Sequence, residues 1–321
     1  MSPSSRLPPP AVPPAVPPAA GPARAAIDIG SNSLLLLVRA ADGTTLHDEA
    51  TVVGLGKGLG DRGLFRPDRM DAALEVLRRY ATTAQGLGVA PGQVRAAATS
   101  AARRALNSAT FFARVAEQTG LQVAVIAGAE EARLTWLGAL DGLPLPLGSV
   151  AVVDLGGGST EVVLGEGERI AFRTSMEIGS VRLTEEFFGE CPGRYDPRAL
   201  SRLRARVATA TEELEPARHP RSVVAVAGTA TTLAAMNLGL ESWDRDVVHG
   251  SRLTRADLRR FIDRLLASEP EERRTWAVVS PERADNLLAG ACVLEGVLTA
   301  LQRESLFISD GGVRHGLLAE G

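Results

Sequence analysis

Two short segments of the sequence place an aspartate, a glycine and a serine in the same order. Residues 27–33 read Ile-Asp-Ile-Gly-Ser-Asn-Ser, and residues 153–159 read Val-Asp-Leu-Gly-Gly-Gly-Ser. An apolar stretch follows each segment, at residues 34–38 and at residues 162–164. Each copy is therefore predicted to form a β-hairpin in which a turn rich in glycine and serine joins two strands.

The residues of these two turns are of the types that bind phosphate. Glycine lets backbone N–H groups converge on an anion, serine adds a hydroxyl donor, and an aspartate at a strand end can hold a metal ion or its waters. One copy alone would indicate an ordinary hairpin, since aspartate and glycine are common in turns. Two matched copies facing each other would clamp a phosphate chain. The predicted phosphate donors are Gly30, Ser31, Asn32, Ser33, Gly156, Gly157, Gly158 and Ser159.

Two further glycine turns fit the same interpretation. Residues 223–227 are predicted to form a strand that runs into Gly228 and Thr229 and then into a helix, whose N-terminus can accept a phosphate oxygen. Residues 306–309 lead in the same way into Asp310-Gly311-Gly312 and a further helix. Each turn alone is ordinary loop chemistry. Together with the hairpins, they add Gly228 and Thr229 to the predicted phosphate donors.

The elements that must position these turns alternate along the chain, which predicts an α/β protein. The predicted strands are residues 25–29, 34–40, 94–98, 123–126, 149–155, 161–164, 170–175, 223–227 and 306–309. One predicted helix is capped by Asp68 and has an apolar face of Met70, Ala73, Leu74, Leu77 and Tyr80. The other predicted helices lie near residues 107–119, 130–140, 196–214, 254–267 and 283–302.

The domain organisation follows from proline and glycine. Nine of the 19 prolines fall within residues 1–22, and such a segment prefers extended polyproline II to a packed state, so residues 1–23 are expected to be a disordered tail. Residues 141–148 are rich in glycine and proline and mark a domain boundary. We expect domain I at residues 24–140, domain II at residues 141–302, and a return of residues 303–321 to domain I.

Composition excludes several classes of protein. The 321 residues include 35 basic and 38 acidic side chains, and the net charge of −3 argues against a protein that coats DNA or RNA. The longest aliphatic run, residues 34–38, is far shorter than the roughly 18 apolar residues of a membrane span. Cys191 and Cys292 lie far apart without metal-ligand spacing. The protein is therefore expected to be cytoplasmic, where thiols stay reduced.

Further motifs accompany the two hairpins. They are Thr99-Ser100-Ala101-Ala102-Arg103-Arg104-Ala105, Gly128-Ala129-Glu130-Glu131-Ala132-Arg133, Val248-His249-Gly250, Arg283-Ala284-Asp285 and Asp310-Gly311-Gly312-Val313-Arg314. With these motifs the chain resembles the exopolyphosphatase and guanosine pentaphosphate phosphohydrolase (Ppx/GppA) family over residues 25–318. The resemblance implies the fold of the actin, Hsp70 and sugar-kinase superfamily, in which two ribonuclease-H-like domains face each other across a cleft.

Two features depart from the family pattern. His315 stands where the family usually has an acidic residue, which puts the function of that position in question. The chain ends at Gly321, whereas long members continue into helical domains, so the resemblance is to the short two-domain form. That form implies a preference for short polyphosphate, and the family resemblance leaves a homodimer open.

Hydrolysis of a terminal phosphoanhydride needs a positioned water, charge neutralisation and a metal ion. Asp28, Asp154 and Glu161 lie on the predicted hairpins, and their hard oxygen atoms suit Mg²⁺, with Mn²⁺ as a substitute. The resemblance places Asp154 and Glu161 at metal-site positions of the family.

The remaining catalytic candidates are neighbours in pairs. Glu130 and Glu131 diverge by about 100° on a helix, so only one can face the cleft. The resemblance implies that Glu131 is the general base for the attacking water and leaves Glu130 as an ordinary helix-start glutamate. One of Arg103 and Arg104 would stabilise charge on the transferring phosphoryl group, and Arg104 is the first choice.

The resemblance implies a Mg²⁺-dependent hydrolase that releases terminal orthophosphate from inorganic polyphosphate, from guanosine pentaphosphate, or from both. Two alternatives stay open on the sequence. A kinase of the same superfamily would transfer phosphate from ATP only when an acceptor is present. A non-catalytic sensor would bind guanosine alarmones without releasing phosphate.

Overall fold

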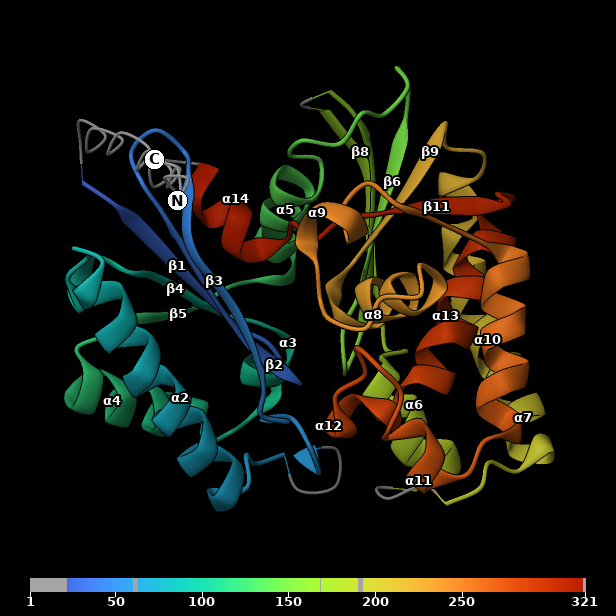
Figure 1. Ribbon diagram of the computed structural model, residues 1–321, viewed down its shortest axis with the longest axis horizontal. Helices are drawn as coiled ribbons and strands as arrows, with labels where there is room; N and C mark the ends of the chain where they lie inside the picture. The colour runs from blue at the N-terminus through green and yellow to red at the C-terminus, as the bar shows by residue number, and fades with distance from the viewer. Residues whose placement is uncertain (1–21, 60–62, 168, 190–192, 320–321) are drawn as a thin grey trace, which may run out of the picture.

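The computed structural model describes residues 22–59, 63–167, 169–189 and 193–319. Apart from residues 22 and 23, the tail predicted at residues 1–23 lies outside these ranges, and so does Cys191. The described chain forms two α/β halves that lie side by side, each built around one β-sheet (Figure 1).

The first sheet has five strands in the order β3-β2-β1-β4-β5. Neighbours among β1, β2 and β3 are antiparallel, whereas β4 runs parallel to β1 and β5 parallel to β4. The strands are β1 (Arg24–Ile29), β2 (Ser33–Arg39), β3 (Thr45–Val52), β4 (Arg95–Ala98) and β5 (Val123–Val125).

The second sheet has six strands in the order β10-β11-β9-β6-β7-β8. Apart from the edge strand β10, it repeats the first sheet, with a third, second, first, fourth and fifth strand side by side. The prediction of an α/β protein with two ribonuclease-H-like units is therefore confirmed. The strands are β6 (Val150–Leu155), β7 (Thr160–Glu166), β8 (Arg169–Met176), β9 (Ser222–Val226), β10 (Arg252–Thr254) and β11 (Ser305–Ile308).

Most helices cover the outer faces of the sheets. The core of the first half joins β1 and β2 to α2 and α4, and the core of the second half joins β6, β9 and β11 to α7, α10 and α13 (Figure 1). No helix in the described ranges is long and apolar enough to cross a membrane. The helices on the outer faces are α2 (Pro67–Gly86), α4 (Ser108–Thr119), α6 (Ser180–Phe188), α7 (Pro197–Thr211), α10 (Arg255–Ala267) and α13 (Leu287–Ala300).

The shorter elements differ most from the sequence-based expectations. Two strands occur where none was expected, namely β3, whose residues are mostly half exposed, and the three-residue strand β10. Asp68 is not the cap of α2, because Pro67 begins that helix and Arg66 precedes it. The remaining helices are α3 (Ser100–Arg104), α8 (Ala227–Asn237), α9 (Arg245–Val248), α11 (Pro270–Arg273) and α12 (Pro281–Ala284), with single 3₁₀ turns at Pro91–Gln93 and Glu212–Ala217.

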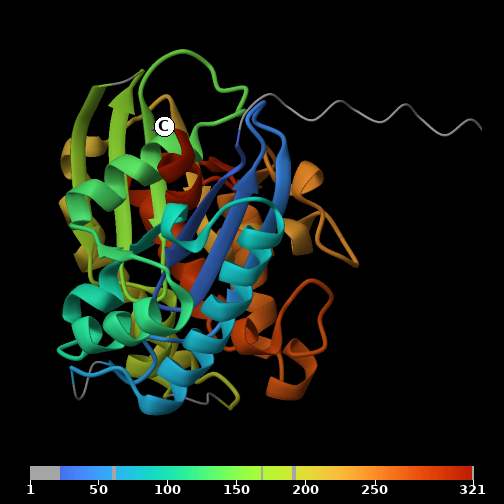
Figure 2. The same ribbon diagram turned by 90° about the vertical axis from the view of Figure 1, so that its left-hand side faces the viewer.

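Two helices, α5 (Gly128–Ala139) and α14 (Val313–Ala319), lie between the sheets (Figures 1 and 2). Ala132, Trp136 and Ala139 of α5 pack on the second sheet. Leu134, on another face of α5, packs with α14 against the first sheet. The pair of helices therefore connects the two apolar cores.

Glycine makes the contact between α5 and α14 close. A Cβ atom added to Gly138 would lie 2.1 Å from the carbonyl oxygen of Gly312, and one added to Gly316 would lie 2.1 Å from that of Leu134. Likewise, a Cβ atom on Gly311 would lie 2.0 Å from the carbonyl oxygen of Gly138. Real Cβ atoms do not approach a carbonyl this closely, so only glycine fits at these three positions.

Ion pairs join α14 to the edge strand β3 and to the segment after β11. The buried Arg314 donates to both carboxylate oxygens of Asp48 on β3, at 3.1 and 3.2 Å, and to Asp310 after β11 at 3.1 Å. Residues 303–321 are thus divided, since β11 pairs in the second sheet while α14 packs on the first. The domain boundaries stay a prediction.

The glycine contact leads to a test of stability. We expect Gly138→Ala to lower the free energy of unfolding by about 1–3 kcal/mol, because the added methyl group forces α5 and α14 apart. Gly86→Ala is the matched control, since a Cβ atom there has no neighbour within 4 Å and alanine favours the helix. Thermal and urea unfolding of both variants measure the difference; equal stability of the two would contradict the close contact.

Candidate functional site

The two predicted hairpins close in the same way. The N–H of Gly30 donates to the carbonyl oxygen of Ser33 at 3.0 Å, and the N–H of Gly156 donates to that of Ser159 at 3.0 Å. The positions behind the turns differ, since Asp154 pairs across the strands with Glu161, whereas Asp28 pairs with Leu35. The duplication therefore gives the second hairpin an additional carboxylate.

The carbonyl groups of both turns are already engaged. In the first turn, the carbonyl oxygen of Asn32 accepts from residues 53 and 54, and that of Ser31 accepts from Gly56 at 2.7 Å. In the second, the carbonyl oxygen of Gly157 accepts from residues 181 and 182 at the start of α6. These bonds orient the turns and leave the N–H groups of residues 31, 32, 157 and 158 without a hydrogen-bond acceptor among the described residues.

The two turns meet at the junction of the halves. A Cβ atom added to Gly157 would lie 3.3 Å from the Cβ atom of Asn32, and one added to Gly158 would lie 3.5 Å from the Oγ of Ser31. A side chain at Gly157 would require Asn32 to shift by a few tenths of an ångström, whereas the distance at Gly158 is an ordinary van der Waals contact. The structure therefore brings the two repeated turns face to face.

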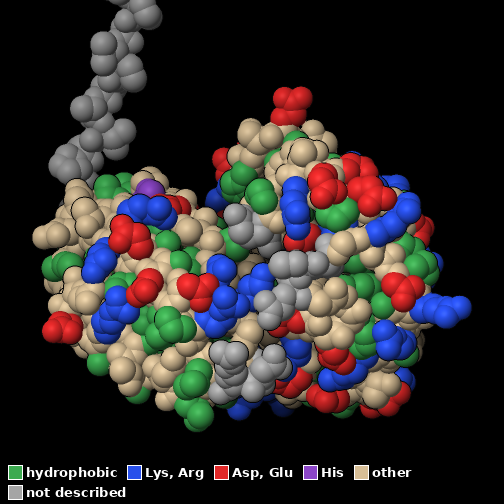
Figure 3. All heavy atoms as spheres, turned by 90° about the horizontal axis from the view of Figure 1, so that it is seen from below, with side chains coloured by type: hydrophobic (Ala, Val, Ile, Leu, Met, Phe, Trp, Pro, Cys, Tyr) green, Lys and Arg blue, Asp and Glu red, His purple; other side chains and the backbone are tan. Residues whose placement is uncertain are grey.

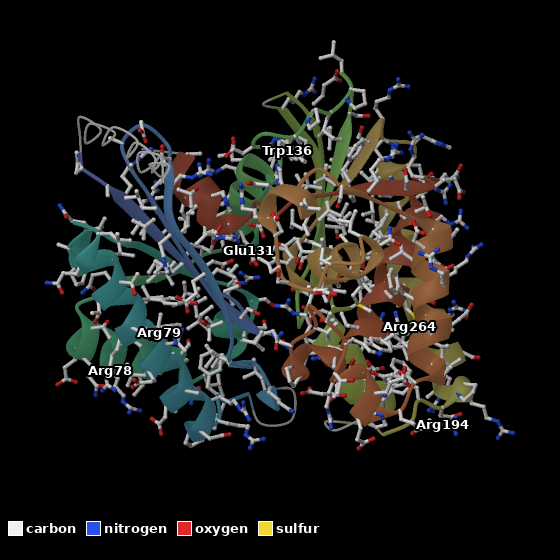
Figure 4. All side chains as sticks on the ribbon, in the orientation of Figure 1. Arg78, Arg79, Glu131, Trp136, Arg194 and Arg264 are labelled. Atoms are coloured by element: carbon white, nitrogen blue, oxygen red, sulfur yellow. The ribbon has the colours of Figure 1, made fainter. Side chains whose placement is uncertain are left out.

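Four carboxylates lie behind the turns. Asp28 is on β1, Asp154 on β6, Glu161 on β7 and Glu131 on α5. Figure 4 shows Glu131 at the junction of the two halves. Asp154 is close enough to the other three for their negative charges to raise its pKa. The site thus concentrates negative charge from both halves.

Burial and mutual repulsion set the protonation of this group. Burial, followed by the charge of Glu131, raises the pKa of Asp28 to about 7. The same two causes raise the pKa of Glu161 to about 7. Burial also raises the pKa of Glu131, against the opposing effect of Arg103. Such a group binds protons or a cation readily.

Three polar side chains fix the orientation of the carboxylates. Thr135 donates to Asp154 at 3.2 Å, and Ser175 donates to Glu161 at 2.6 Å. The Nη1 of Arg103 donates to Glu131 at 2.6 Å.

The two residues of each neighbouring pair of catalytic candidates have different surroundings. The side chain of Glu131 is 8% exposed, whereas that of Glu130 is 41% exposed and pairs with Arg133 at 2.7 Å. Arg104 does not contact Glu131; instead, its Nη2 would lie 3.1 Å from a Cβ atom on Gly158. Arg103 therefore reaches the carboxylates, and Arg104 reaches the second turn.

Gly228 and Thr229 follow β9, which runs parallel to β6 and places Val226 beside Asp154. A Cβ atom on Gly228 would lie 2.7 Å from the guanidinium of Arg283, and Thr229 is buried against Gly290 of α13. Neither residue lines the cleft at the turns. The assignment of these two residues as phosphate donors stays a prediction.

A different trio has potential metal-ligand atoms within 4.8 Å of one another, namely Asp48, Asp310 and His315. Arg314 already donates to both aspartates, and Arg245 donates to Asp310 at 3.2 Å. This positive charge opposes a cation there. In contrast, the Oδ1 of Asp28 is buried without a hydrogen-bond partner in the described structure. Asp28, Asp154 and Glu161 offer the oxygen donors that Mg²⁺ prefers, but their ligand atoms do not all lie within 4.8 Å of one another in the described structure, so this metal site stays a prediction.

Sequence reasoning missed the side chains that orient the carboxylates. Thr135 lies four residues after Glu131 on the same helix, a spacing that places both on one face and could have indicated it. Ser175 is opposite Glu161 in the pairing of β7 and β8, so its role depends on a strand register that the sequence does not contain.

Comparison with known proteins identifies close relatives. The model of the Ppx/GppA phosphatase family matches residues 36–321. Exopolyphosphatase 2 of Mycobacterium tuberculosis is 36% identical over 315 residues, which cover 91% of this chain and 96% of the relative. Exopolyphosphatase 1 of the same organism is 30% identical over 298 residues and covers 91% of this chain and 86% of its own length.

Solved structures agree with this relationship. The crystal structure of an exopolyphosphatase from Cytophaga hutchinsonii superposes with a TM-score of 0.84 at 28% identity, covering 92% of this chain and 96% of that one. The Aquifex aeolicus member of the Ppx/GppA family superposes with a TM-score of 0.75 at 32% identity, covering 92% and 96%. With its paired turns, its buried carboxylates and a family match over most of its length, this chain belongs to the Ppx/GppA phosphatase family.

Proposed function

We propose that this protein is a Mg²⁺-dependent exophosphatase that releases terminal orthophosphate from inorganic polyphosphate, guanosine pentaphosphate, or both. The observation that carries the proposal is the cluster of four carboxylates directly behind two facing turns with unused N–H groups. The turns suit an anionic phosphate chain, and the carboxylates suit a cation and a water beside it. The relatives named exopolyphosphatase support the same substrate class.

In this mechanism the turns bind the terminal phosphate. The N–H groups of residues 31, 32, 157 and 158 donate to phosphoryl oxygens, which orients the scissile bond toward α5. Glu131 accepts a proton from a water that attacks the terminal phosphorus, and the shortened chain leaves. Little covalent chemistry is asked of the protein, so positioning supplies most of the rate.

Arg103 keeps the general base ready. Its guanidinium donates to Glu131 at 2.6 Å and opposes the rise in the pKa of that carboxylate that burial causes. The ionised form of Glu131 is the form that can accept a proton. The sequence favoured Arg104 as the arginine of the catalytic centre. In this proposal it is Arg103 that acts there, beside Glu131 and the attacking water.

Asp28, Asp154 and Glu161 would hold Mg²⁺, or Mn²⁺ in its place. When bound, the ion neutralises charge on the phosphoryl oxygens and lowers the repulsion between substrate and carboxylates. Thr135 and Ser175 hold Asp154 and Glu161 in fixed orientations for this role.

Phosphate release measured in parallel tests the proposal. The substrates are short polyphosphate, long polyphosphate, guanosine pentaphosphate and ATP, each with Mg²⁺. We expect release from polyphosphate or guanosine pentaphosphate without any acceptor. Transfer from ATP only in the presence of an acceptor would indicate a kinase, and nucleotide binding without release would indicate a sensor.

The general base can be tested by comparing neighbours. We expect Glu131→Gln to lower kcat by roughly 10²–10⁴-fold, because the amide keeps the size of the side chain but cannot accept the proton. Glu130→Gln should keep most of the activity, since Glu130 is half exposed and pairs with Arg133. Steady-state kinetics on both variants measure the effect; similar losses in the two would remove the assignment.

Removal of metal should abolish turnover. Without a cation, the carboxylates of Asp28, Asp154 and Glu161 repel an anionic substrate. We expect phosphate release to stop in excess EDTA and to return when Mg²⁺ or Mn²⁺ is added beyond the chelator. Full activity in EDTA would refute the metal requirement.

A further inference from the structure

A cleft of ≈240 Å³ opens between the two halves at the facing turns. Residues of both halves line it, including Ser31 and Asn32 of the first turn and Gly157 and Gly158 of the second. None of the four carboxylates described above lines it. Because residues of both turns line the cleft, a phosphate chain bound at the turns would extend into it.

The cleft is basic. Lys57, Arg69, Arg104 and Arg182 line it, against two acidic residues, Glu185 and Asp285. The charge of Asp285 is compensated from outside the cleft, because Arg273 and Arg274 donate to it at 3.3 and 2.9 Å. Figure 3 shows Lys and Arg side chains gathered at the junction of the halves when the molecule is seen from below. We call this cavity, with its four basic residues Lys57, Arg69, Arg104 and Arg182, the basic cleft.

Arg104 is the residue of the basic cleft that reaches the second turn from the first half. Its Nη2 would be 3.1 Å from a Cβ atom on Gly158, and its buried Nε has no hydrogen-bond partner in the described structure. Burial and the neighbouring charge of Arg182 lower the pKa of Arg104, and the negative charge of Glu177 opposes this only in part. A buried donor of this kind costs free energy until an acceptor satisfies it.

Arg182, on α6, lines the cleft from the second half. Its Nε donates to the carbonyl oxygen of Gly158 at 2.7 Å, and its guanidinium pairs with Glu177 at 2.5 Å. Arg104 and Arg182 thus flank the second turn from different halves of the molecule. Guanidinium groups bind phosphate through paired hydrogen bonds. The arrangement of Arg104 and Arg182 therefore suits a phosphate group in the cleft, next to the second turn.

The rest of the lining is aliphatic. Val52, Val53 and Val181 contribute the large apolar side chains, and no described residue that lines the cleft has an aromatic ring. Nucleobases are commonly held by stacking on such rings. The basic cleft therefore suits a linear phosphate chain and offers a nucleoside little.

We infer that the basic cleft binds the phosphate groups behind the scissile bond, with Arg104 holding the first of them, and that it selects an inorganic phosphate chain over a nucleotide. The inference rests on the proposed function, because it takes the terminal phosphate to lie between the turns and the carboxylates. Arg104 is then a specificity-determining residue of the leaving chain rather than a partner of Glu131.

Binding and kinetics of Arg104→Gln test the inference, with Arg78→Gln as the matched control. Arg78 lies on the exposed face of α2, away from the junction (Figure 4). Calorimetric titration with tripolyphosphate in EDTA, where no turnover is expected, should show at least tenfold weaker binding for Arg104→Gln and unchanged binding for Arg78→Gln. With Mg²⁺, KM for polyphosphate should rise roughly tenfold to hundredfold while kcat changes little, as expected for lost ground-state binding.

The outcomes separate this inference from the proposed function. If the wild type releases phosphate but Arg104→Gln has the same Kd and KM as the wild type, the inference is wrong and the proposed function stands. If the wild type releases no phosphate but binds tripolyphosphate in a manner that depends on Arg104, the proposed function fails and the basic cleft stands. A lower wild-type KM for guanosine pentaphosphate than for a polyphosphate of five units would overturn the selection against nucleosides.

Discussion

The close contact between α5 and α14 is the constraint on which the rest of the structure depends. At Gly138, Gly311 and Gly316 the backbones touch with no room for a side chain, and the outer faces of the pair are buried in the cores of the two halves. Glu131 lies two turns before Gly138 on α5. The same contact that joins the sheets therefore also sets the depth at which Glu131 reaches the carboxylates of both hairpins.

Repetition and asymmetry of the two hairpins both contribute to the site. The hairpins have the same turn hydrogen bond and bury their turn carbonyls against a following segment in the same manner. Yet Leu35 occupies the position that corresponds to Glu161, and the first hairpin contributes one carboxylate where the second contributes two. The repeat gives both hairpins a turn suited to bind an anion. Because only the second hairpin has a second carboxylate, more of the acidic side chains come from the second half.

The sequence was most informative where patterns are local. The buried strands, the two hairpin turns and the divergence of Glu130 from Glu131 follow from apolar runs, glycine positions and helix geometry. β3 escaped prediction because an edge strand with half-exposed residues lacks the apolar alternation of a central strand. Ser175, the placement of Thr229 against Gly290 and the separation of Arg103 from Arg104 depend on contacts between distant segments. No spacing along one chain contains such contacts.

The glycine contact between α5 and α14 also limits how the molecule can be recombined. The two helices are distant in sequence and lie at the ends of different halves, yet neither fits without the backbone of the other. A chimaera assembled from the halves of two relatives would keep this contact only if both parents had glycine at the positions of Gly138, Gly311 and Gly316. The helices α5 and α14 should therefore be exchanged together. A junction between exchangeable segments is better placed outside this helix pair than between the two sheets.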